Sequence, residues 1–228
     1  MAPWILVAIL AVSGAVSLGL LYNSLIVLPR EMHRVYRETL LSLALLVESK
    51  QPSAKGHCER VADLSLRIGR AIRLSMADQH ILEYAALMHD VGKVGVRADV
   101  LNKEGPLTPE EQQELQLHTL HSAAILDEIS GEGLREMAEL VGWHETPWEE
   151  VATGARLKRL VGVLAVAEAW DTLTHGRAYE APLSAEEAKG RLLRGVGTLY
   201  CEEAVEALFA VTGIPGLLPE LERVGGLA

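Results

Sequence analysis

The chain has 228 residues, of which 49% are hydrophobic and 23% charged, a composition that excludes disordered and low-complexity proteins. The formal net charge of −10 provides no chain-wide basic footprint, so no nucleic-acid polymer is expected as a partner. Cys58 and Cys201 are the only cysteines and cannot build a disulfide framework, which favours an intracellular location for the folded part.

The first 29 residues contain no Asp, Glu, Lys or Arg. Their apolar run exceeds the ~20 residues that a bilayer-spanning helix needs. The alternative, a cleaved signal peptide, would have basic residues before a core of about 7–15 residues. Arg30, Arg34 and Arg37 follow the run directly, so the positive-inside rule places the C-terminal part in the cytoplasm. We predict a single-pass transmembrane anchor over residues 1–29, in the cell inner membrane.

Residues 30–50 keep apolar side chains at helical spacing and are expected to form a helical stalk. A homodimer formed through this stalk is left open. Residues 51–228 show no alternating strand pattern and no glycine-rich phosphate loop, so a Rossmann or P-loop fold has no support. An all-α domain is predicted over 51–228. The expected helices cover about 57–74, 76–91, roughly twenty residues from Thr108, about 134–142, 155–174, a helix capped by Ser184, and about 201–211, with an irregular segment over 91–107.

Histidines and acids gather at the ends of these predicted helices, and one acid interrupts an apolar run. The candidate metal ligands are His57, His89, Asp90, His118, His144 and Glu168. Neutral imidazole and carboxylate are the usual ligands of borderline and hard divalent metals. A buried acid is costly unless it is paired or ligated. The pattern therefore suggests a metal site, and ordinary surface or hydrogen-bonded core residues are the alternative.

The segments MHDVGKVGV and ADVLNKEGPLTPEE resemble the HD-domain phosphohydrolases, and more narrowly their HD-GYP branch. GHCERVA, LHTLHSAAIL and AEAWDTLTHGRAY resemble further segments of that family. The resemblance implies an all-α HD-domain bundle that holds one or two divalent cations, such as Fe, Mn or Zn. By position, His57, His89, Asp90 and Glu168 would surround one metal. Asp90 would bridge to a second metal held by His118 and His144.

The resemblance also implies roles around the metals. Asp90 and Lys93 would be catalytic, and Lys93 and Arg177 would contact the substrate phosphate. Asp171 lies three residues after Glu168 on the same helix face and is expected to orient a histidine ligand. A water between two cations has a lowered pKa and acts as hydroxide near neutral pH. The implied reaction is hydrolysis of a nucleotide phosphoester, typically cyclic di-GMP in this family.

The chain departs from the family pattern at several positions. Trp143 replaces the first histidine of a tandem His-His-Glu, and a D-G-x-G-Y-P stretch is absent. Glu168 is one methylene longer than the usual Asp, and Glu180 stands where a basic residue is usual. These departures motivate an alternative function: a catalytically degenerate regulatory module that binds a nucleotide or a partner protein. The third hypothesis, after the hydrolase and the regulatory module, is a structural helical scaffold with a vestigial site.

Overall fold

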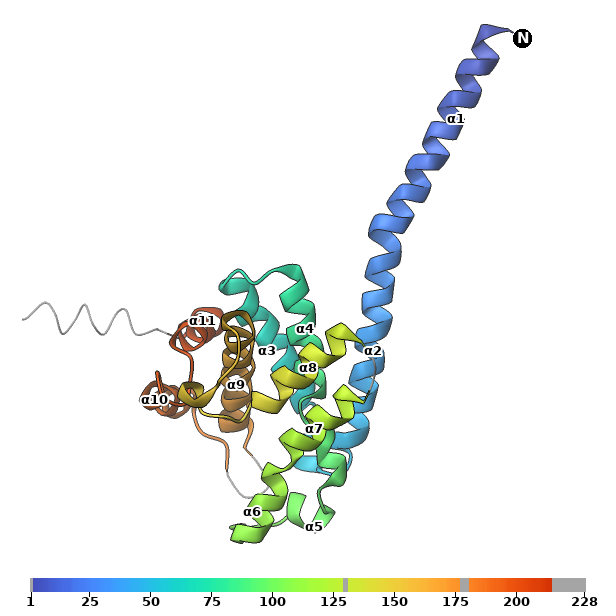
Figure 1. Ribbon diagram of the computed structural model, residues 1–228. Helices are drawn as coiled ribbons and strands as arrows, with labels where there is room; N and C mark the ends of the chain where they lie inside the picture. The colour runs from blue at the N-terminus through green and yellow to red at the C-terminus, as the bar shows by residue number, and fades with distance from the viewer. Residues whose placement is uncertain (1, 129–130, 177–180, 215–228) are drawn as a thin grey trace, which may run out of the picture. The chain divides into compact units, whose positions relative to one another are not determined.

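The computed structural model describes residues 2–128, 131–176 and 181–214 of two compact units, Met1–Leu40 and Leu41–Ala228. The helices, labelled in Figure 1 where there is room, are α1 (Pro3–Tyr22), α2 (Leu28–Glu48), α3 (His57–Ala71), α4 (Met76–Met88), α5 (Ala98–Leu101), α6 (Pro109–Gln116), α7 (His118–Asp127), α8 (Glu132–Trp143), α9 (Ala155–His175), α10 (Ala185–Arg194) and α11 (Glu202–Thr212). A π-helical segment, η1 (Asn23–Val27), and the 3-10 turns η2 (Pro52–Ala54), η3 (Val91–Gly95) and η4 (Trp148–Glu150) connect them. The described residues form no strand, so the predicted all-α fold is confirmed.

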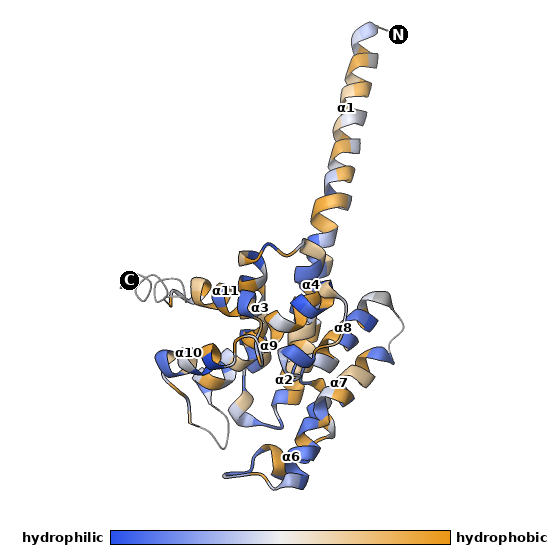
Figure 2. Ribbon diagram, turned by 60° about the vertical axis from the view of Figure 1, so that its left-hand side comes forward, coloured by the Kyte–Doolittle hydropathy of each residue, from blue (hydrophilic) through white to orange (hydrophobic). Residues whose placement is uncertain are grey.

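The first unit is helical, and its α1 segment has no charged side chain, whereas α2 begins with Arg30, Glu31 and Arg34. One helix, Pro3–Glu48, contains an 18-residue window with a mean hydropathy of 2.4 and no residue buried in the protein. Figure 2 shows apolar residues along most of α1. By length and composition this helix suits a bilayer, since about 20 apolar residues cross the hydrocarbon core.

The second unit is a helical bundle around α9. Helix α3 packs against α4, α9 and α11, and α4 also packs against α8. On α9, the side chains of Leu160, Val163 and Leu164 are fully buried, as expected for a long and mostly apolar helix at the centre of a domain. Helix α7 packs against α8 and η3, which brings η3 to the edge of this core.

Side-chain caps fix the starts of three helices. Ser75 accepts the N–H of Asp78 at the start of α4. Capping boxes begin α6, with Thr108 and Glu111, and α10, with Ser184 and Glu187, so that each pair satisfies two backbone N–H groups. The sequence predicted all three starts.

The stretch expected as one helix from Thr108 is divided into α6 and α7 at Leu117. The ring nitrogen Nδ1 of His118 lies 2.7 Å from the carbonyl oxygen of Leu115, which it can satisfy at the break. Within the segment expected to be irregular, η3 and α5 are short helical turns. The break places His118 at the first position of α7, facing the end of α4.

Candidate metal centre

His57 stands at the first position of α3, where Glu48 fixes the chain. The carboxylate of Glu48 is buried and accepts the backbone N–H groups of Gly56 and Cys58, at 2.6 and 2.8 Å. These N–H groups have no partner within the helix, and a carboxylate at a helix N-terminus is also favoured by the helix dipole. Glu48 thereby holds the backbone on both sides of His57.

His89 and Asp90 lie where α4 ends and η3 begins. Gly92 brings η3 against α7: its N–H donates to Ser122 Oγ at 2.7 Å, and a Cβ at Gly92 would lie 2.1 Å from the His118 carbonyl oxygen. No side chain fits at that distance, so the glycine is required by the close approach of two backbones. This approach sets the separation between Asp90 and His118.

Asp90 lies between histidines from three elements. Its Oδ2 is 3.5 Å from His89 Nε2 and 3.8 Å from His57 Nε2. Its Oδ1 is 3.2 Å from His118 Nε2. Each carboxylate oxygen thus faces a different part of the cluster, an arrangement suited to bridging two cations.

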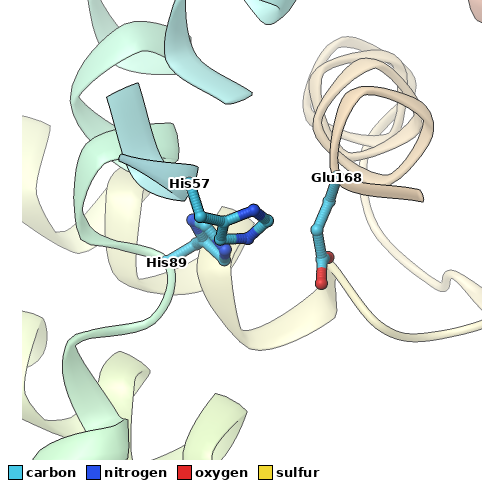
Figure 3. Close-up of side chains that lie close together, drawn as sticks. All are labelled: His57, His89 and Glu168. Atoms are coloured by element: carbon cyan, nitrogen blue, oxygen red, sulfur yellow. The ribbon is translucent and has the colours of Figure 1, made fainter. Parts of the chain in front are cut away.

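The six predicted ligands form two adjoining groups. In the first, ligand atoms of His57, His89 and Glu168 all lie within 4.8 Å of one another, and Figure 3 shows these side chains side by side, from α3, the end of α4 and α9. The second group is Asp90, His118 and His144. Nε2 of His144 lies 3.6 Å from Glu168 Oε2 and so connects the two groups. Six positions that are far apart in the sequence therefore lie together in the structure, and their role as metal ligands stays a prediction.

Three of these histidines are oriented in the same way. In His89, His118 and His144, Nδ1 lies 2.6–2.7 Å from the carbonyl oxygen of the residue three positions earlier. A neutral imidazole that donates from Nδ1 presents Nε2 as a lone pair, which is the form a metal binds. Burial lowers the pKa of His89 to about 4, so its ring is neutral at pH 7.

Four buried ligand atoms lack a hydrogen-bond partner in the described part of the chain. They are Nε2 of His89, His118 and His144, and Oδ1 of Asp90. Buried polar atoms are nearly always satisfied, because an unmade hydrogen bond costs about 1–3 kcal/mol. Four such atoms turned toward one another match the donor set of a divalent cation, so the residues fit the metal that the sequence predicts.

His57 has a different support, supplied by Asp171. Its Nδ1 lies 2.7 Å from Asp171 Oδ2, and the guanidinium of Arg60 donates to both carboxylate oxygens, at 2.7 and 2.9 Å. Burial opposes the charge, but His57 and Arg60 hold the pKa of Asp171 at about 2. Asp171 is thus ionised and lies within hydrogen-bond distance of His57 Nδ1, which is the contact that its predicted orienting role requires.

Lys93 lies beside Asp90. Its ammonium is 2.6 Å from Asp90 Oδ2, on a side chain that is 13% exposed. Burial alone would raise the pKa of Asp90. The nearby charges of Lys93 and His89 outweigh burial and hold this pKa well below its usual range. Arg177, the other predicted phosphate contact, lies outside the described residues.

Sequence reasoning missed four residues around the centre. Glu48 and Arg60 support the ligands, as described above. Cys58 groups with His89 and Asp90, but burial and the two nearby acids raise the pKa of its thiol well above the usual range, which opposes thiolate ligation. Glu145 groups with His144 and Glu168, and only its position directly after His144 could have pointed to it.

Two hollows open beside the cluster. The inner hollow, with a volume of about 30 Å³, is lined by residues that include His57, Lys93 and His118. The outer hollow, of about 350 Å³, is lined by residues that include His144, Glu168, Arg191 and Tyr200. Glu145 and Thr172 border both. The cluster is therefore reached from two adjoining spaces of very different size.

A family model for the HD domain matches residues 42–204, a span that contains all six clustered side chains. The chain belongs to the HD-domain family. A cyclic di-GMP phosphodiesterase of Thermotoga maritima is 33% identical to this HD-domain protein over 175 residues, which are 75% of this chain and 48% of that relative. The 3′3′-cGAMP-specific phosphodiesterase 3 of Vibrio cholerae is 30% identical over 168 residues, 72% of this chain and 36% of the relative.

A solved structure from Vibrio cholerae, a cyclic GMP-AMP-specific phosphodiesterase, superposes with a TM-score of 0.52 at 28% identity. The match covers 79% of this chain and 42% of that one. The HD-domain chain thus spans about half or less of the length of these relatives. The family expected from the sequence is confirmed.

Proposed function

We propose that this HD-domain protein is a metal-dependent phosphodiesterase of the HD-GYP-like branch. The observation that carries the proposal is the convergence of six buried His, Asp and Glu side chains whose ligand atoms form two adjoining groups. One or two divalent cations held there would supply Lewis-acid stabilisation and an activated water. Fe, Mn and Zn all suit imidazole and carboxylate ligands.

The protein's own residues would hold the metal and stabilise the substrate phosphate. His57, held by Asp171 and Arg60, would keep its Nε2 in place as a ligand. Asp90 would bridge the two ligand groups. The Lys93 ammonium, 2.6 Å from Asp90, would stabilise negative charge that develops on the phosphate. Arg177 is proposed as a second phosphate contact.

The proposed substrate is a cyclic dinucleotide, with cyclic di-GMP first. The relatives named above are phosphodiesterases of cyclic di-GMP and of 3′3′-cGAMP. In support, the cluster adjoins an outer hollow of about 350 Å³, a size typical of sites for small organic ligands.

The test uses the full chain in detergent or nanodiscs, purified without chelator. We expect one to two metals per chain by elemental analysis, and linear product from cyclic di-GMP by chromatography. Asp90→Asn should lose the metal and the formation of product, because the Asp90 carboxylate faces both ligand groups. Asp99→Asn is the matched control, because it makes the same change at an exposed carboxylate outside the cluster. Wild-type protein that carries metal and forms no product from cyclic di-GMP or 3′3′-cGAMP would refute the activity.

A regulatory module that binds a nucleotide or a partner protein is the second candidate. It is favoured by Trp143, which lines a groove with Leu120, Ala123 and Ala138 between α7 and α8, so the position before His144 adds no ligand. This candidate predicts ligand binding without product.

We further propose that residues 1–29 anchor the protein in the cell inner membrane, with residues 51–228 in the cytoplasm. Support comes from the apolar helix and from Arg30, Arg34 and Arg37 directly after the run. Residues 30–50 would then be the stalk, through which a homodimer could form. Carbonate extraction of membranes, with protease protection of the C-terminal part, tests the anchor and its orientation.

A further inference from the structure

Two residues at the end of α2 hold the backbone on both sides of the candidate metal centre. Glu48 accepts the N–H groups at the start of α3, the helix that begins with His57. Lys50, two positions later, donates to carbonyl oxygens within and just after η3, the turn that Asp90 precedes. One short stretch of chain therefore contacts both segments that carry ligands of the cluster.

The ammonium group of Lys50 is matched to three carbonyl oxygens. Its Nζ lies 3.3 Å from the carbonyl oxygen of Lys93, 2.7 Å from that of Val94 and 2.8 Å from that of Val96. An ammonium has three N–H donors, and the carbonyl groups at the C-terminal end of a helix lack enough N–H partners within it. Lys50 thus supplies the donors that the end of η3 requires.

The point from which the Lys50 side chain extends is itself held by hydrogen bonds. The Lys50 carbonyl oxygen accepts the side-chain amide of Asn102 at 2.8 Å, and the same amide donates to the Ala98 carbonyl oxygen. The next residue, Gln51, is buried and donates from Nε2 to the Leu101 carbonyl oxygen at 3.1 Å. Contacts with α5 and the residue after it therefore fix the base of the Lys50 side chain.

Lys93 is held on both sides of its own backbone. On the N-terminal side, the Gly92 N–H donates to Ser122 Oγ at 2.7 Å. On the C-terminal side, Lys50 binds the carbonyl oxygens described above. The Lys93 ammonium lies 2.6 Å from Asp90 Oδ2, so a shift of this backbone would move it relative to the carboxylate. A misplacement of about 1 Å at a catalytic group lowers a rate by as much as about 100-fold.

We infer that Lys50 is a positioning residue that holds the end of η3 and thereby keeps the Lys93 ammonium beside Asp90. Among the described residues that line the two hollows Lys50 is absent, so it acts through η3 and not on the substrate. Its effect on turnover rests on the proposed function, in which Lys93 stabilises the phosphate. Its hold on η3 does not depend on that function.

Hydrogen exchange of the metal-loaded full chain in nanodiscs, measured by mass spectrometry, tests the hold on η3. Lys50→Met keeps the aliphatic stem and removes three donors. Exchange in the peptide that contains the Lys93 and Val96 amides should become about 10–100-fold faster, the usual effect of losing charged hydrogen bonds. The amides of α9 should keep their wild-type rates. Lys50→Arg retains the charge and should recover most of the protection.

Steady-state kinetics with cyclic di-GMP tests the link to Lys93. Lys50→Met should lower kcat and kcat/KM by the same factor, about 10–100-fold, at wild-type metal content. The double variant with Lys93→Met should be no slower than Lys93→Met alone, because Lys50 acts through Lys93. Lys55→Met is the matched control for both measurements, since Lys55 is exposed and is not among the described residues lining either hollow. It should behave like the wild type.

The outcomes separate the inference from the proposed activity. Unchanged exchange in η3 would overturn the inference, and so would an equal rise in α9, which indicates general destabilisation. A double variant at least tenfold slower than Lys93→Met, or loss of metal from Lys50→Met, would overturn the link to Lys93. If Lys50→Met does not fold, Lys50→Gln keeps two donors and should show the same pattern at smaller factors. A wild type without product would refute the activity, and the exchange in η3 then decides the role of Lys50.

Discussion

Gly92→Ala should dismantle the metal centre without removing any ligand. The added Cβ would lie 2.1 Å from the His118 carbonyl oxygen and 2.5 Å from the Ser122 nitrogen. Both are helix backbone atoms, so η3 would have to move by about 1 Å, against a metal–ligand tolerance of about 0.2 Å. Overpacking costs about 1–3 kcal/mol, and loss of the hydrogen bond to Ser122 Oγ adds about 0.5–1.5 kcal/mol.

The expected total of about 2–4 kcal/mol corresponds to a Tm lower by about 4–16 °C in a chain of this size. Thermal unfolding and elemental analysis of the purified chain measure both effects, and we expect metal content to fall well below that of the wild type. Gly95→Ala is the matched control, because it lies in the same turn and its Cβ would meet the flexible His121 side chain at 3.4 Å, an ordinary van der Waals contact. If Gly92→Ala kept wild-type metal content and Tm, the close approach of η3 and α7 would be refuted.

Three further predictions concern the same centre. Asp171→Asn should weaken metal binding about 10–100-fold in competition with a chelating dye, because His57 loses its anionic partner; unchanged affinity would contradict this. Lys93→Met should keep the metal but lower kcat for cyclic di-GMP about 10²–10³-fold, by analogy with a lost charge-stabilising donor; a normal kcat would exclude Lys93 from phosphate stabilisation. A metal present at 100 times its Kd should stabilise the folded protein by about 2.7 kcal/mol relative to the metal-free protein, and this difference is measured as a lower Tm after the metal is stripped. An equal Tm with and without metal would argue against metal binding to the folded state.

The sequence predicts the ligands because each lies at a recognisable place. His89 and Asp90 follow an apolar helix, and Glu168 interrupts another. The signals for helix starts are also local, since Ser184 and Glu187, three positions apart, form the capping box that begins α10. These features depend on periodicity and short-range chemistry, which a single sequence displays.

The supporting contacts could not be predicted in the same way. Arg60 meets Asp171 across 111 positions of the chain, and the carboxylate of Glu48 caps α3 from the preceding helix. Arg191 and Tyr200 reach the outer hollow only through the packing of α10 and its following turn. Such contacts follow from tertiary packing, which no local pattern records.

Metal binding and turnover are separable questions for this centre. Without a cation or a water, the buried Nε2 atoms of His89 and His144 would each leave a hydrogen bond unmade, at about 1–3 kcal/mol. Cations, with the waters that they carry, remove that cost whether or not a substrate is cleaved. The departure at Trp143 leaves this balance unchanged, because its side chain lines the groove between α7 and α8. The cluster therefore argues directly for ligation, and catalysis rests on what Lys93 and the outer hollow add to it.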